Sequence, residues 1–246
     1  GAAVEGQFSR SVCVVVAHDS EVVHFRGRAY PARRSDFALT AAPRQTESCR
    51  MKRFKVGIVG YGWAALAHIP AINASPLAQV TAICSARPLD AAALAAQHGG
   101  PLRTFTRYED LLRDPEVDAV SICSYHALHA EQVIAAAKAG KHIICEKPLA
   151  LSWKDVRAVE RAVKKAGVKF CICFELRYSS QFLALKALID QGLLGTLHYG
   201  EVDYYHGVGP WYREFQWCTT IKDCGSSLLE AGCHAMDALL LCLGDA

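Results

Sequence analysis

The sequence lacks the features that would mark a membrane, nucleic-acid-binding or metal-binding protein. No apolar run approaches the length of a membrane-spanning helix. The formal net charge of +3 is too small and too dispersed for a nucleic-acid-binding surface. The eleven cysteines form no C-x-x-C pair and no regular Cys/His spacing, so we predict no metal site. With 52% apolar and 21% charged residues, the 246-residue chain is expected to form one large or two modest globular domains.

Disulfide bonds are not expected either. Most cysteines sit inside apolar, strand-like runs, where a thiol behaves as a small apolar side chain. We therefore predict reduced core residues and a cytoplasmic protein. The cysteines in such runs are Cys84, Cys123, Cys145, Cys171 and Cys173.

Residues 1–50 contain seven arginines and no lysine, whereas residues 51–246 contain nine arginines and eleven lysines. The change falls at Met51, and we predict that residues 1–50 are a disordered or spurious extension. The runs VCVVV and EVVHF could pair as a hairpin, but nothing in the sequence supplies them with a core, which favours disorder. A signal peptide is the rival interpretation, but its apolar stretch would be short and followed by dozens of polar residues.

The stretch from Lys55 to His68, KVGIVGYGWAALAH, runs from a β-rich apolar segment through close glycines into an alanine-rich helix. Gly60, Gly62 and Ala65 form the pattern G-x-G-x-x-A. Such a turn lets a pyrophosphate approach the first helical N–H groups, whose partial positive charge favours an anion. The order of strand, turn and helix predicts dinucleotide binding. The expected contacts are Gly60, Tyr61, Gly62, Trp63 and Ala64.

From Met51 the chain alternates strand and helix, which predicts an α/β domain over residues 51–174 with a Rossmann-type, doubly wound parallel sheet. Ser152 is expected to cap a helix with Asp155 in its first turn, and Gly140 and Gly167 to end helices. Expected strands are 55–59, 79–84, 118–123, 142–145 and 169–173. The first expected helix ends at Ala74, and the later expected helices cover 89–98, 108–113, 128–139 and 152–166.

In such a sheet the ligand lies at the carboxyl ends of the strands. Ser85 and Arg87 follow the second strand, where NAD-preferring proteins place an acidic residue. A hydroxyl and a guanidinium suit a 2′-phosphate, so we predict NADP in preference to NAD, although both residues could belong to a simple polar turn. Further polar candidates follow later strands: Ser124, His129, Glu146 and Lys147. Arg177, just past this domain, is also counted among the cofactor contacts.

The runs GIVGYGWAALAH, VDAVSIC with His129 behind it, and AGKHIICEKPLA occur in this order. With them the chain resembles the Gfo/Idh/MocA family of sugar and polyol oxidoreductases from about Met51 to Gly244. The resemblance implies that Lys147 projects over the cleft where nicotinamide and substrate meet. His126 stands where relatives often have an asparagine, and we leave it out of the cofactor contacts.

Residues 175–246 are predicted to begin an α+β substrate and dimerisation domain with an open, largely antiparallel sheet. A helix from Gln181 to Gln191 and an alternating run from Thr196 to His206 support this. The aromatic segment GVGPWYREFQWC suggests a sugar platform, although packing explains it equally well. The substrate-contact candidates there are Trp211, Tyr212 and Arg213.

Glu230 and His234 lie four apart on an expected helix, which would place them on one face. The family carries an acid and a histidine at this spacing, usually with aspartate where this chain has Glu230. Relatives continue beyond the end of this chain, so a truncated second domain and a homo-oligomeric longer form are expected.

The resemblance implies an NAD(P)-dependent oxidoreductase that transfers hydride between the nicotinamide and a secondary hydroxyl or ketone of a small carbohydrate. Oxidation needs a base near neutrality for the hydroxyl proton, which suits His234. Lys147 would stabilise the same oxygen and Glu230 would orient the histidine. Two alternatives stay open: a glycosidase that uses a transient NAD redox cycle, and a non-catalytic dinucleotide-binding sensor.

Overall fold

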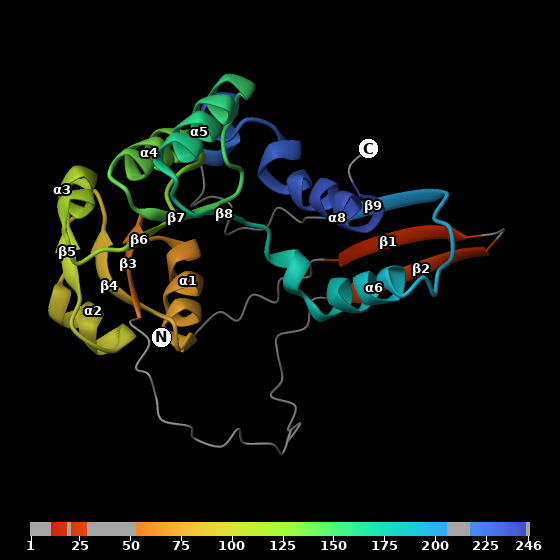
Figure 1. The fold of residues 1–246 in the computed structure, drawn as a ribbon, viewed down its shortest axis with the longest axis horizontal. Helices are drawn as coiled ribbons and strands as arrows, with labels where there is room; N and C mark the ends of the chain where they lie inside the picture. The colour runs from red at the N-terminus through yellow and green to blue at the C-terminus, as the bar shows by residue number, and fades with distance from the viewer. Residues whose placement is uncertain (1–10, 19–20, 29–52, 206–216, 245–246) are drawn as a thin grey trace, which may run out of the picture. The chain divides into compact units, whose positions relative to one another are not determined.

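The computed structural model describes residues 11–18, 21–28, 53–205 and 217–244 (Figure 1). These residues divide into two compact units. The parallel-sheet unit contains residues 53–173 and 217–225. The antiparallel-sheet unit contains residues 11–18, 21–28, 174–205 and 226–244.

The parallel-sheet unit is built on six parallel strands in the spatial order β5-β4-β3-β6-β7-β8. Counted within the unit, this is the order 3-2-1-4-5-6 of a doubly wound dinucleotide-binding sheet, which reverses direction between β3 and β6. Its elements are β3 (Phe54–Val59), α1 (Trp63–Ala74), β4 (Ala78–Cys84), α2 (Ala91–His98), β5 (Arg103–Phe105), α3 (Tyr108–Arg113), β6 (Ala119–Ile122), α4 (His126–Lys138), β7 (His142–Glu146), α5 (Trp153–Ala166), β8 (Phe170–Cys173) and α7 (Ile221–Cys224). The predicted fold is confirmed.

Helices cover both faces of this sheet (Figure 1). On one face, Ala65 and Ile69 of α1 and Leu94 of α2 pack on Ile58 and Ile83 of the strands. On the other face, α3, α4 and α5 enclose a larger apolar cluster. Each aliphatic side chain fully buried in this way contributes roughly 1.5–3 kcal/mol to the free energy of unfolding. The sheet is therefore stabilised by an apolar core on each face.

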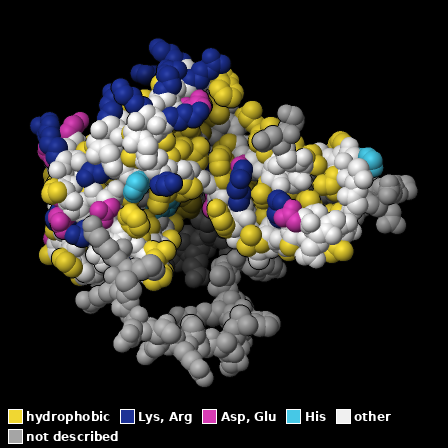
Figure 2. All heavy atoms as spheres, viewed as in Figure 1, with side chains coloured by type: hydrophobic (Ala, Val, Ile, Leu, Met, Phe, Trp, Pro, Cys, Tyr) yellow, Lys and Arg dark blue, Asp and Glu magenta, His cyan; other side chains and the backbone are white. Residues whose placement is uncertain are grey.

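The ends of α5 follow the predicted cap chemistry. The Ser152 hydroxyl accepts a hydrogen bond from Asp155 N at 3.2 Å, and Gly167 ends the helix in the left-handed conformation. The outer face of α5 is basic, and its Lys and Arg side chains gather at the top of Figure 2. The positive charge of the chain is therefore more clustered than its composition indicates.

The antiparallel-sheet unit has three strands in the order β2-β1-β9, with both pairings antiparallel. Buried Phe182 and Leu185 meet Ala238 and Cys242 in its core. Its elements are β1 (Ser11–His18), β2 (Glu21–Arg28), a 3-10 turn (Glu175–Tyr178), α6 (Ser180–Asp190), β9 (Tyr199–Tyr205), a π-helical turn (Leu228–Gly232) and α8 (Cys233–Leu243). An open antiparallel sheet was predicted here.

Two features of the chain differ from expectation. The runs 11–18 and 21–28 are strands instead of disordered chain, because β9 supplies β1 with a pairing partner along its length. Residues 217–225 belong to the parallel-sheet unit, although the sequence assigned them to the second domain. The chain returns to the parallel-sheet unit at these residues because α7 contacts α4.

One helical run in the described part of the chain is long and apolar enough to cross a membrane, by length and composition alone. It covers Ile221–Leu243, with 23 residues and a mean hydropathy of 1.3. We had expected no such run. Its last part, α8, packs against α6 and β9 and carries the ion-paired Asp237, and 22% of the apolar window is buried.

The nine cysteines from Cys84 to Cys242 are all free thiols. Cys84, Cys123 and Cys145 are buried as predicted, and Cys173 is half-buried. Cys171 is exposed, because it lies on the edge strand β8.

Candidate active site

The turn after β3 brings the ends of β3 and β6 into close contact. Gly60 has a φ of +88°, and a Cβ there would lie 2.8 Å from the carbonyl oxygen of Cys123. Only glycine fits this approach. Gly62 is the N-cap of α1, with open space around its Cβ position and no side chain among the described residues capping the helix. The start of α1, with the partial positive charge of its helix dipole, therefore lies at this turn, where an anion would be favoured.

The residues predicted to read a 2′-phosphate lie beside this turn. Arg87 Nη2 donates a hydrogen bond to the carbonyl oxygen of Tyr61 at 3.3 Å. The Tyr61 hydroxyl lies 2.8 Å from His98 Nε2. Ser85 is buried at the end of β4, while the Trp63 side chain is 60% exposed. The structure therefore brings the glycine turn and Arg87 together, as predicted.

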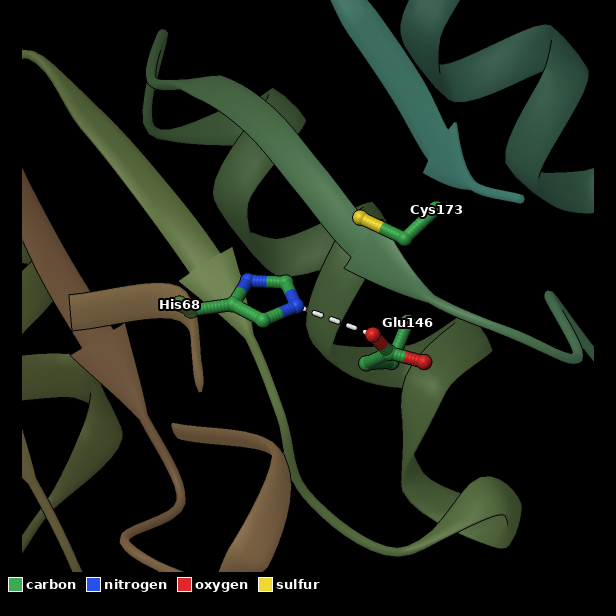
Figure 3. Close-up of side chains that lie close together, drawn as sticks. All are labelled: His68, Glu146 and Cys173. Carbon is green, nitrogen blue, oxygen red and sulfur yellow. Dashed lines mark hydrogen bonds and ion pairs between the residues drawn. The ribbon is translucent and has the colours of Figure 1, made fainter. Parts of the chain in front are cut away.

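A polar cluster absent from our predictions surrounds His68. We call His68, Ser121, Glu146 and Cys173 the His68 corner, of which Figure 3 draws His68, Glu146 and Cys173. His68 Nε2 donates to Glu146 Oε1 at 2.9 Å, and Nδ1 donates to Ser121 Oγ at 2.8 Å. Glu146 Oε2 accepts a hydrogen bond from the backbone N–H of Lys147 at 3.2 Å. A chain of hydrogen bonds therefore runs from the middle of β6 to the backbone of Lys147.

Charge holds this corner together. Burial opposes protonation of His68, but hydrogen bonds with Cys123, Cys173 and Glu146 raise the pKa of His68 to about 12. Burial would raise the pKa of Glu146, but the hydrogen bond and charge of His68 lower it overall. Imidazolium and carboxylate therefore form a half-buried ion pair at neutral pH.

A second cluster follows β6. We call His126, His129, Trp217 and Cys224 the His126 corner. The Trp217 ring meets His126 edge-on at a centroid distance of 4.9 Å, and Cys224 Sγ lies 3.5 Å from His126 Nδ1. Burial, followed by the charges of His129 and Lys147, lowers the pKa of His126 to about 3. His126 is therefore neutral at ordinary pH.

His129 lies fully buried between two turns. Its Nδ1 is 2.7 Å from the carbonyl oxygen of Pro148, and its Nε2 is 3.0 Å from the carbonyl oxygen of Ser124. Burial lowers the pKa of His129, although both carbonyls favour the protonated form. Ser124 Oγ donates to Gln132 Oε1 at 2.6 Å. His129 ties the two turns to each other, and its direct contact with a cofactor stays a prediction.

Lys147 lies between the two corners. Glu146 before it is held by His68, and Pro148 after it is held by His129. Its charge lowers the pKa of both Glu146 and His126. The half-buried Lys147 therefore sits in a turn that is anchored on both sides.

In the antiparallel-sheet unit, His234 is 3% exposed near the start of α8. Its ring meets Phe174 edge-on at 6.2 Å and Tyr204 at 5.8 Å between centroids. The carboxylate that the structure places near His234 Nδ1 is that of Glu175, with Oε2 at 3.7 Å. Because Glu175 lies on a 3-10 turn far away in sequence, no spacing rule could identify it.

Glu230 lies in the π-helical turn that precedes α8. The expectation of one face shared with His234 assumed uninterrupted α-helix, and π-helical geometry changes the angle between positions four apart. Arg177, predicted to contact a cofactor, pairs bidentately with Asp237 at 2.8 and 2.5 Å. Trp211, Tyr212 and Arg213 lie outside the described residues.

Two family profiles match this chain. The profile described as "Oxidoreductase family, NAD-binding Rossmann fold" matches residues 54–174, and that of the GFO/IDH/MocA C-terminal domain matches residues 182–246. The chain belongs to the GFO/IDH/MocA family. Residues 54–174 are thus the family's NAD-binding Rossmann domain.

Curated members of the GFO/IDH/MocA family with similar sequences include sugar and polyol dehydrogenases. The inositol 2-dehydrogenase/D-chiro-inositol 3-dehydrogenase of Lactiplantibacillus plantarum is 32% identical over 74% of this chain and 50% of its own length. The levoglucosan dehydrogenase of Pseudarthrobacter phenanthrenivorans is 34% identical over 60% of this chain and 40% of its own length. The chain thus spans about half the length of the curated relatives it matches.

Solved structures agree with this assignment. A levoglucosan dehydrogenase in complex with NADH and levoglucosan is similar with a TM-score of 0.69 and 28% identity, over 79% of this chain and 55% of that one. The WlbA dehydrogenase of Bordetella pertussis, in complex with NADH and UDP-GlcNAcA, has a TM-score of 0.69 and 26% identity, over 78% and 59% of the two chains.

Proposed function

We propose that this protein is an NAD(P)-dependent oxidoreductase that transfers hydride between the nicotinamide and a secondary hydroxyl or ketone of a sugar or polyol. The observation that carries the proposal is the double anchoring of Lys147, between Glu146 and Pro148, in the unit that also holds the glycine turn. A fixed cation in that position suits the negative charge that develops on a reacting oxygen. The sugar and polyol dehydrogenases among its relatives support the substrate class.

The cofactor would lie on the glycine turn, with its pyrophosphate at the start of α1 and its 2′-phosphate near Ser85 and Arg87. The guanidinium of Arg87 already lies against Tyr61 O, which supports a preference for NADP. When bound, the nicotinamide supplies or accepts the hydride.

Three side chains of the chain would act on the substrate. Lys147 would donate a hydrogen bond to the reacting oxygen, and His234 would take or return the hydroxyl proton at a ring nitrogen. Glu175, near His234 Nδ1, would stabilise the protonated ring, and Glu230 stays a candidate for orienting His234. We further propose a cytoplasmic enzyme and a homo-oligomer in the full-length protein.

A panel assay tests this proposal. The purified full-length protein is mixed with NAD⁺ or NADP⁺ and with myo-inositol, levoglucosan and related cyclic polyols, and reduced nicotinamide is followed by absorbance. We expect turnover on at least one compound, lost in Lys147→Ala and kept in the exposed control Lys154→Ala. Calorimetry measures cofactor affinity in the same samples.

The outcomes separate the alternatives. Failure to bind either cofactor would contradict the proposal outright. Cofactor binding without turnover would favour a sensor, and cleavage of a glycoside without net reduced nicotinamide would favour the redox-cycling glycosidase.

A further inference from the structure

Three potential metal ligands converge in the His68 corner. His68 comes from α1, Glu146 from the end of β7 and Cys173 from the end of β8, and one ligand atom of each lies within 4.8 Å of the others. Glu146 and Cys173 are paired in register on neighbouring strands, which places their side chains on one face of the sheet. In Figure 3 the Nε2 nitrogen, a carboxylate oxygen and the sulfur face one another.

Two of these side chains are oriented by outer hydrogen bonds. Ser121 Oγ holds His68 Nδ1 at 2.8 Å, and the Lys147 N–H holds Glu146 Oε2 at 3.2 Å. The atoms that face inward are thus His68 Nε2 and Glu146 Oε1. Histidine ligands of metals are usually fixed in this way through their second nitrogen, and ligating carboxylates are also hydrogen-bonded.

We propose that the His68 corner binds a divalent cation of the zinc type, through His68 Nε2, Glu146 Oε1 and Cys173 Sγ. Imidazole, thiolate and carboxylate together suit Zn²⁺ or Co²⁺, whereas Mg²⁺ and Ca²⁺ take oxygen ligands alone. Tetrahedral bonds of about 2.0–2.3 Å place ligand atoms roughly 3.3–3.8 Å apart. His68 Nε2 and Glu146 Oε1, now 2.9 Å apart, would open slightly, and ligand atoms near the 4.8 Å limit would move closer. A water would complete the coordination. The proposal replaces our expectation of no metal site, which rested on spacing along the sequence.

Binding has a defined proton balance. The cation takes the Nε2 lone pair that carries a proton in the His68–Glu146 ion pair, and it takes the sulfur of Cys173 as thiolate. One proton therefore leaves the imidazolium and one leaves the thiol, both to solvent. The carboxylate of Glu146 exchanges a hydrogen bond for a metal–oxygen bond.

Cobalt titration tests the proposal on the full chain, kept reduced and freed of metal. We expect uptake of about one equivalent of Co²⁺, with a thiolate-to-cobalt charge-transfer band and the visible bands of tetrahedral Co²⁺. Zn²⁺ should displace the cobalt, and uptake should release protons into a weak buffer. The readout is independent of enzyme activity.

Matched variants locate the site. Cys173→Ser should abolish the charge-transfer band, whereas Cys171→Ser, an exposed thiol two positions earlier on the same strand, should keep it. Ser121→Ala removes only the outer partner of His68 and should weaken affinity by about 10- to 100-fold. This variant keeps all three ligands, so the test survives if Cys173→Ser fails to fold.

The contrary results are equally clear. Absence of a thiolate–cobalt band in the unmodified chain would overturn the proposal. So would an unchanged band in Cys173→Ser, or equal loss in Cys171→Ser, since surface thiols would then be the ligands. Unchanged affinity in Ser121→Ala would also count against it.

Discussion

The two corners beside Lys147 hold histidines whose pKa values shift in opposite directions. His68 and His126 are both largely buried, yet the pKa of His68 rises to about 12 and that of His126 falls to about 3. His68 faces a carboxylate and thiols, whereas His126 faces a second histidine and the charge of Lys147. Burial penalises the charged form in both, so the neighbouring charges decide the outcome. The charge state of a buried histidine therefore depends on the charges of its neighbours as well as on its burial.

The largest effect is expected at Lys147, which lies between the corners. Lys147→Ala should lower turnover by at least about a hundredfold and leave cofactor affinity nearly unchanged, because the side chain acts on the reacting oxygen. His234→Ala should do the same. If both residues serve one oxygen, the double variant should lose much less than the product of the single losses. Multiplicative losses in steady-state kinetics would refute a shared oxygen.

The next effect compares the corners directly. His68→Gln should reduce the free energy of unfolding by about 3 kcal/mol, because Glu146 stays buried without its cation. His126→Gln should cost less than about 1 kcal/mol, since a neutral ring with a weak thiol contact is removed. Urea unfolding measures both. Adding Glu146→Gln to His68→Gln should recover part of the lost stability. Equal losses in His68→Gln and His126→Gln would contradict the predicted difference between the two corners.

Arg87 belongs to neither corner, so its variant is a reference for the effects predicted there. Arg87→Ala should weaken NADP binding by about 10- to 100-fold and leave NAD nearly unchanged, because a charge-assisted hydrogen bond is worth roughly 1.5–3 kcal/mol. Calorimetry with both cofactors checks this. Equal losses would assign Arg87 to the turn at Tyr61 and remove the argument for NADP.

The pH dependence of stability should differ between the corners. The folded pKa of His126 is below 6.5, so its contribution is present above pH 6.5 and is lost as pH falls toward 3. The folded pKa of His68 is above 6.5, so its contribution is full below pH 6.5 and is lost as pH rises toward 12. Glu146 loses its contribution as pH falls below 4.5.

Chemical denaturation between about pH 4 and pH 9 measures these slopes, which approach 1.4 kcal/mol per pH unit for one proton. His126→Gln should flatten the acid side, and His68→Gln should flatten the alkaline side. Parallel curves for wild type and both variants would show that neither histidine titrates as described.

The smallest effect on either corner is expected from the N-terminal hairpin, which belongs to the other unit. Deleting residues 1–50 removes the partner of β9 and exposes its backbone donors and acceptors, so self-association should increase. Cofactor affinity and both corners should be unaffected. Light scattering and calorimetry test this. An unchanged state of association would support the original expectation that these residues contribute nothing.

Patterns that are local in sequence predicted most of the parallel-sheet unit. Alternating strands and helices, the glycine turn at Gly60 and the caps at Ser152 and Gly167 each depend on neighbouring residues, and the structure confirms them. Strand β5 has three residues, which is too short to show a period. Local rules therefore gave the scaffold and most of its element ends.

The sequence could not predict contacts between distant positions. His68 and Glu146 are 78 positions apart, and the only local signal was a histidine within the otherwise mostly apolar helix α1. Residues 217–225 return to the parallel-sheet unit because α7 contacts α4. No change in composition marks this return in the sequence. The partner of His234 depended on a 3-10 turn and a π-helical turn that interrupt simple periodicity.

The position of His129 has a mechanical consequence. Its ring spans the carbonyl oxygens of Pro148 and Ser124, so the turns after β7 and β6 are joined by one buried side chain. Displacing either turn would therefore disturb a contact that His129 makes with the other turn. In the proposed reaction the two turns would form one wall that is already in place before the substrate binds.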